Sequence, residues 1–139
     1  MQIRLHWPPH DSAEVAIRAA AYPCRGAVGR LLTGAEGGNG ILIWVRNRGG
    51  AAGDYPILAR GDSTTPRGAT VSVRFMVGEI ARGFGLDSGL VQITTAGSRL
   101  NATLRGSGID YSVGQRVSLV GSVAALPSSS DSVSCKVQL

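Results

Sequence analysis

The sequence predicts an all-β protein, and three observations lead to this prediction. Apolar and polar residues alternate with a period of two along most of the chain, as in strands with one buried face. Turn-forming residues, glycine above all, interrupt the alternation roughly every eight to twelve residues. The apolar fraction of 43% is that of a globular protein and argues against disorder, and 139 residues fit one β domain, residues 1–139.

The N-terminal segment gives one clear strand and one ambiguous element. Residues 2–7 alternate until Pro8 and Pro9 end the pattern. The stretch Asp11-Ser12-Ala13-Glu14 then resembles a capping box, which predicts at most one short helix near residues 12–22. Val15, Ile17 and Ala19 also alternate as a strand would, but we expect the helix, ended by Pro23.

The middle of the chain contains three predicted strands. Ile41, Ile43 and Val45 form one face of the first, and residues 54–59 form a short strand that Pro56 places at a sheet edge. Residues 71–77 alternate again, and a bulge at Gly78 would return Ile80 to the core.

The C-terminal half continues the pattern to the last residue. Residues 90–95 and 99–105 flank Ala96-Gly97-Ser98, which predicts a hairpin. Residues 115–125 form the next strand. Residues 133–139 alternate cleanly, so we expect a strand there as well.

About eight short strands favour an antiparallel sandwich of jelly-roll-like topology. The alternative is an OB-like barrel built mainly from residues 70–139, in which Tyr111–Val123 has the glycine-punctuated pattern of small nucleic-acid-binding barrels.

The net charge of +5 comes almost entirely from arginine. It suits an acidic partner, either a carboxylate-rich protein surface or nucleic acid, although scattered arginines are also typical of a compositional bias. In the nucleic-acid hypothesis Trp44 stacks a base, and the arginines bind phosphates. The candidate contact residues are Trp44, Arg46, Arg48, Arg74, Arg99 and Arg105. The competing interpretation is that Trp44 covers a second layer of the core.

Arg60-Gly61-Asp62 spells an adhesion tripeptide at the tip of a predicted connection between strands. Gly61 supplies turn freedom, and Asp62 can hydrogen-bond nearby backbone, so turn chemistry alone explains the motif. An adhesive role would require display outside a cell.

The residues point away from catalysis and from cofactors. His6 and His10 lack a third metal ligand, no GxSxG or phosphate-binding glycine motif occurs, and the acidic residues are dispersed. Cys24 and Cys135 lie in no metal-binding spacing and, without an export signal, are expected to be reduced.

We therefore expect a non-enzymatic structural or assembly protein, such as a capsid decoration (cement) or head–tail joining protein of a phage. Its partners would be proteins of a larger assembly or further copies of itself, with no cofactor, membrane or small-molecule substrate. Its location would be a virion or the cytoplasm, since no secretion signal is visible. The alternative is a single-stranded nucleic-acid-binding barrel.

Overall fold

The computed structural model describes residues 1–7, 11–27, 29–47, 52–62 and 64–135. The described residues are all-β: ten strands with antiparallel pairing and one short 3-10 turn, η1 (Arg25–Ala27). The strands are β1 (Gln2–Trp7), β2 (Asp11–Ala16), β3 (Ala19–Pro23), β4 (Arg30–Glu36), β5 (Asn39–Arg46), β6 (Gly53–Pro56), β7 (Gly68–Val77), β8 (Ile80–Ala96), β9 (Arg99–Asp110) and β10 (Arg116–Leu126).

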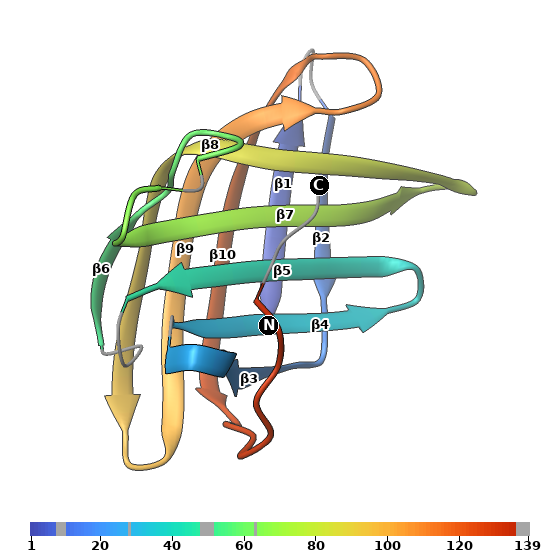
Figure 1. Cartoon of the computed structure of the whole chain (residues 1–139). Coiled ribbons are helices and arrows are strands. Elements are labelled where there is room, and N and C mark those ends of the chain that lie inside the picture. Colours follow the sequence, from blue (N-terminus) through green and yellow to red (C-terminus); the bar gives the residue numbers. More distant parts are fainter. Residues whose placement is uncertain (8–10, 28, 48–51, 63, 136–139) are drawn as a thin grey trace.

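The strands form one sheet, where a sandwich of two sheets was expected. Hydrogen bonds connect nine strands in the order β2-β1-β10-β9-β8-β7-β5-β4-β3, and β6 pairs with β8. The sheet curls into a half-barrel, so that β7, β5, β4 and β3 cross in front of β1, β10 and β9 (Figure 1). The C-terminal half forms no separate OB-like barrel, because β7 pairs with β5 and β10 pairs with β1.

The long strand β8 makes the corner of the half-barrel. Residues 80–85 of β8 pair with β7, whereas residues 90–93 pair with β6, and the register with β9 shifts between Leu86 and Ser88. Glycines allow the backbones to approach closely here: a Cβ added to Gly108 would lie 1.8 Å from the carbonyl oxygen of Gly85. The sheet can therefore bend sharply at this point.

The inner face of the sheet carries the core, as the alternating pattern predicted. Side chains from Ile3 in β1 to Leu126 in β10 form one buried cluster. Tyr55 and Phe84 are its largest fully buried members. Each fully buried apolar side chain stabilises the fold by about 1.5–3 kcal/mol.

The helix expected near residues 12–22 is wrong, because that segment contains β2 and β3. All six residues of β2 pair with β1. Ile17, only 2% exposed, lies in the core between the two strands, and its backbone exchanges hydrogen bonds of 2.7 and 2.8 Å with Met1. Strand pairing and burial of Ile17 thus outweigh the local capping signal.

The bulge expected at Gly78 is also wrong. Gly78, with a φ of 62°, forms a two-residue turn with Glu79, and Val77 pairs with Ile80 across it. Ile80 therefore lies at a hairpin tip and is 69% exposed, far from the core that it was expected to join.

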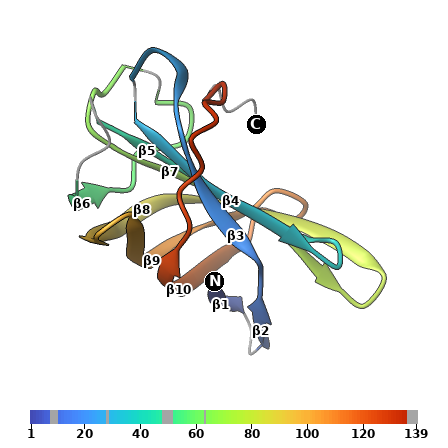
Figure 2. The same cartoon turned by 90° about the horizontal axis from the view of Figure 1, so that it is seen from below.

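The segment after β10, residues 127–135, is here called the C-terminal strap. It runs parallel to β3: Ala21 N donates to Pro127 O at 2.9 Å, Ser129 N to Ala21 O at 2.8 Å, and Val133 N to Pro23 O at 3.0 Å. Figure 2 shows it continuing from the end of β10, and its pairing places it beside β3. The strap thus connects the β10 side of the half-barrel to β3. Of the strand expected over residues 133–139, Val133 bridges to Cys24, and residues 136–139 lie outside the described ranges.

Candidate functional site

The adhesion tripeptide forms a tight turn. Asp62 N donates to Ala59 O at 3.1 Å, and Gly61 takes a φ of 82°. A hydrogen-bonded four-residue turn with a positive φ at its third residue is a type II turn, in which glycine is favoured at that position. The structure therefore places Arg60-Gly61-Asp62 where the sequence predicted a turn.

The carboxylate of Asp62 is directed back into its own loop. Oδ1 accepts hydrogen bonds from Thr64 N at 3.0 Å and Thr65 N at 2.9 Å, and Oδ2 accepts one from the Thr65 hydroxyl at 2.5 Å. The Thr65 hydroxyl bond, then the two backbone bonds and the charge of Arg46, hold the pKa of Asp62 below its usual value. The carboxylate is thus used in closing the loop.

Arg46 fixes this loop onto β5. Its guanidinium donates hydrogen bonds to the carbonyl oxygens of Asp62 and Thr65, and lies 3.8 Å from the Asp62 carboxylate. It also stacks 4.5 Å from the ring centroid of Trp44, two residues earlier on the same face of β5. Since Arg46 is only 9% exposed, its contacts are internal ones.

Trp44 packs on a second, smaller core cluster on the outer face of the sheet. The buried members of this cluster are Cys24, Leu31 and Cys135, with Val133 of the C-terminal strap against them. Cys24 and Cys135 form a disulfide, whereas the sequence favoured reduced thiols. The hydrogen bonds between β3 and the strap bring the two cysteines together, which the sequence could not show.

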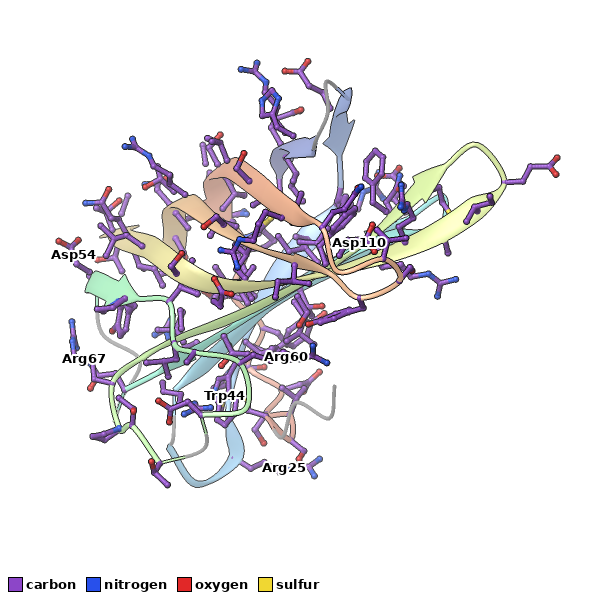
Figure 3. The ribbon with its side chains drawn as sticks, turned by 90° about the horizontal axis from the view of Figure 1, so that it is seen from above. Arg25, Trp44, Asp54, Arg60, Arg67 and Asp110 are labelled. Carbon is purple, nitrogen blue, oxygen red and sulfur yellow. A yellow bond between two sulfur atoms is a disulfide. The ribbon has the colours of Figure 1, made fainter. Side chains whose placement is uncertain are left out.

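Tyr111, which was not among the predicted contact residues, lies over the start of β8. Its hydroxyl would be 1.8 Å from a Cβ added to Gly85, so the ring occupies space that any other residue at position 85 would fill. Arg60 stacks on this ring at 4.3 Å (Figure 3 labels Arg60). Both charged residues of the tripeptide are therefore engaged within the molecule. The alternating glycines at positions 83 and 85 were the available signal that a large side chain covers β8.

Two further candidate arginines, Arg74 and Arg105, lie on separate outer surfaces. Arg74 lines an open hollow of about 570 Å³ over β4, β5, β7 and β8, whose floor includes Gly34, Gly40 and Gly83. Arg105 lines a second open hollow of about 570 Å³ over β8, β9 and β10. Arg99 donates to Ala125 O at 3.4 Å, and Arg48 lies outside the described residues.

The structure therefore does not gather the five described candidate contact residues into one surface. Trp44 and Arg46 are packed together under the turn, while Arg74 and Arg105 line different hollows.

The acidic residues at the corner of the half-barrel are held in ion pairs. Asp110, 1% exposed, pairs with Arg82 at 3.0 Å and accepts a hydrogen bond from Ser112 N (Figure 3 labels Asp110). Arg116 donates two hydrogen bonds, of 2.7 and 2.9 Å, to Asp87. This bidentate contact lowers the pKa of Asp87 and raises that of Arg116.

Across the described ranges, no group of three or more histidine, cysteine, aspartate or glutamate side chains is placed to hold a metal ion. The described residues also contain no helix of the length and apolar character needed to cross a membrane.

Comparisons with known proteins give no relative. The chain matches no protein-family model, and searches of the curated proteins and of the solved structures gave no match. The described residues thus form a curled antiparallel sheet, and contacts within the molecule hold the Arg60-Gly61-Asp62 turn in place.

Proposed function

We propose that this protein is a non-enzymatic structural or assembly protein of a virion, such as a phage capsid decoration (cement) or head–tail joining protein. The observation that carries the proposal is a projecting pair of hairpins with an unpaired edge. We call this pair the arm: residues 35–40 at the β4–β5 turn and residues 74–82 at the β7–β8 turn. Both turns extend beyond the rest of the sheet (Figures 1 and 2).

The two hairpins of the arm are joined side by side. Asn39 Oδ1 accepts a hydrogen bond of 2.8 Å from Met76 N. The Met76 side chain lies against Gly38, where an added Cβ would be 2.7 Å from its Cγ. The arm is therefore a defined element with its own cross-contacts, which favours its use as a preformed contact surface.

One edge of the arm has no strand partner within the described part of the chain. Residues 80–82 of β8 pair with β7, whereas pairing with β9 begins at Phe84 opposite Asp110. Such an edge can accept a strand from a neighbouring subunit, and Ile80, 69% exposed, supplies an apolar anchor beside it. The outer edge of β2 offers a second such edge, because in the described sheet β2 pairs with β1 alone.

The charge on the arm suits a carboxylate-bearing partner. Arg74 is exposed, and no ion pair or hydrogen bond of its side chain occurs with another described residue. A guanidinium of this kind can donate two hydrogen bonds to a partner's carboxylate. The Cys24–Cys135 bond adds support for a location outside the reducing cytosol, such as a particle surface.

Light scattering across a concentration series tests the proposal. We expect the wild-type protein to self-associate or to bind a larger particle, and Ile80→Asp to abolish this by placing a charge at the open edge. The matched control is Val120→Asp, because Val120 is 50% exposed and lies on β10, which pairs with β1 and β9 and not with the arm. A wild-type protein that stays monomeric and binds no particle, or equal effects of the two variants, would contradict the proposal.

The alternative is binding of single-stranded nucleic acid. The guanidinium groups of Arg74 and Arg105, which form no ion pair with another described residue, support it. Titration of a labelled oligonucleotide at low and moderate salt distinguishes the two functions, since phosphate contacts weaken steeply with salt. Absence of salt-sensitive binding would exclude this alternative.

A further inference from the structure

We infer that the C-terminal strap is an exchangeable strand, which can leave its own β3 and pair with β3 of a second copy of this chain. This inference deepens the proposed assembly function and rests on it for its biological use. The physical exchange itself can be tested separately.

The strap is held by few interactions other than the disulfide. Four backbone hydrogen bonds join it to β3 and η1: three involve Ala21 and Pro23, and the fourth runs from Arg25 N to Val133 O at 2.9 Å. Its polar residues are mostly exposed, and Cys135 is its one buried side chain. A segment with so little buried apolar surface opens at a small fraction of the global unfolding free energy.

The surface under the strap is specific for this segment. An arriving strand must accept from Ala21 N and donate to the carbonyl oxygens of Ala21 and Pro23 in the same parallel register. It must also bring a thiol to Cys24 and an apolar side chain against Leu31 and Trp44. The strap of a second copy supplies all of these groups, so it is the partner that fits.

The junction between β10 and the strap is suited to act as a hinge. The pairing register of β10 with β9 shifts between Val123 and Leu126, and Ala125 takes a φ of 54°, which is unusual for a residue with a side chain. Leu126 is 2% exposed and anchors the end of β10 in the core. Rotation after Leu126 can redirect the strap without disturbing the sheet, as in other exchanged strands.

The exchange requires the disulfide to open and to form again between chains. A dithiol reductant donates two electrons and two protons to the Cys24–Cys135 bond, giving two thiols and the oxidised reductant. Oxidised glutathione then accepts two electrons and two protons from Cys24 of one copy and Cys135 of another. The products are one intermolecular disulfide and two molecules of reduced glutathione.

The test mixes two single-cysteine variants, Cys24→Ser and Cys135→Ser, neither of which can form the intramolecular bond. The Cys24→Ser chain keeps Cys135 in its strap, and the Cys135→Ser chain keeps Cys24 beside β3. With oxidised glutathione, the strap of the Cys24→Ser chain should pair with β3 of the Cys135→Ser chain, and a disulfide should trap the two chains as a covalent heterodimer. Non-reducing gels and mass spectrometry should show the heterodimer forming at least about fivefold faster than either homodimer, the factor that one backbone hydrogen bond gives.

A proline pair provides the control within the strap. Adding Val133→Pro to the Cys24→Ser chain removes the N–H that donates to Pro23 O, and should slow heterodimer formation about fivefold. Ser132→Pro, at a neighbouring exposed residue whose N–H makes no hydrogen bond to β3, should have a smaller effect.

Heterodimers that form no faster than homodimers, or that are insensitive to Val133→Pro, would overturn the inference. If exchange fails while Ile80→Asp still abolishes association, the inference falls and the proposed function stands. If exchange succeeds but no assembly forms, the inference stands and the proposed function falls.

Discussion

Reduction of the Cys24–Cys135 bond should destabilise the protein strongly. The bond joins residues 111 apart, and the loop-entropy relation gives a contribution of about 4.8 kcal/mol for a loop of that size. Multiplying about 2.1 cal/mol/K per residue by 139 residues gives an unfolding entropy of about 0.29 kcal/mol/K. The corresponding fall in Tm is about 16 °C, an upper value because the strap can detach before global unfolding.

Urea unfolding of the oxidised and reduced wild-type protein measures this difference without any mutation. We expect the unfolding midpoint to fall on reduction, and the oxidised and reduced forms to keep similar native spectra. Cys135→Ser should match the reduced wild type and should not respond to reductant. Equal midpoints for the oxidised and reduced protein would refute the loop-entropy reasoning, and a reductant-dependent shift in Cys135→Ser would show that the reductant acts elsewhere.

Three further predictions concern the corner and the turn. Gly85→Ala should destabilise the protein by about 1–3 kcal/mol in thermal unfolding, because its Cβ would lie 1.8 Å from the Tyr111 hydroxyl. In a Tyr111→Ala background the same substitution should have little effect. Equal destabilisation in both backgrounds would contradict the contact between positions 85 and 111. Asp62→Ala should release the turn, so that trypsin cleaves faster after Arg60 while cell attachment stays at the wild-type level; unchanged cleavage, or lost attachment, would argue against a purely structural turn. The pKa values of Asp62 and Asp87 are lowered in the folded state, so the contribution of these carboxylates to stability should be complete above about pH 4 and decline as the pH falls through the lowered values. Asp62→Asn should therefore reduce the loss of stability in acid. An unchanged dependence of stability on pH in this variant would contradict the role given to Asp62.

The all-β class and most strands could be predicted because burial of one sheet face leaves a period of two in the sequence. Ile41, Ile43 and Val45 are buried as their alternation indicated, and so are Val71 and Val73. The turn at Arg60-Gly61-Asp62 was also predictable, since glycine and aspartate encode it locally. These features depend on neighbours within a few residues.

The features that were missed depend on contacts between distant residues. Alternation does not specify which strands pair, so it could not distinguish two packed sheets from one sheet that bends at Gly85 and Gly108. The disulfide likewise depends on the strap reaching β3. The exposure of Ile80 had a local signal in the sequence: Gly78 and Glu79 lie between two alternating runs, which is typical of a two-residue hairpin turn. A bulge fits the same residues, so the sequence did not decide between the two.

The pairing of early strands with late residues has a consequence for how the chain acquires its fold. One edge of β1 pairs with β10, and one edge of β3 pairs with the strap. Both ends of the sheet can therefore be completed only after residues beyond 116 have been synthesised. Such non-local pairing places folding in the range of milliseconds to seconds. During synthesis, β1 can pair with β2, and β3, β4 and β5 can pair as a local meander, while the other edge of β1 stays unpaired until β10 has left the ribosome.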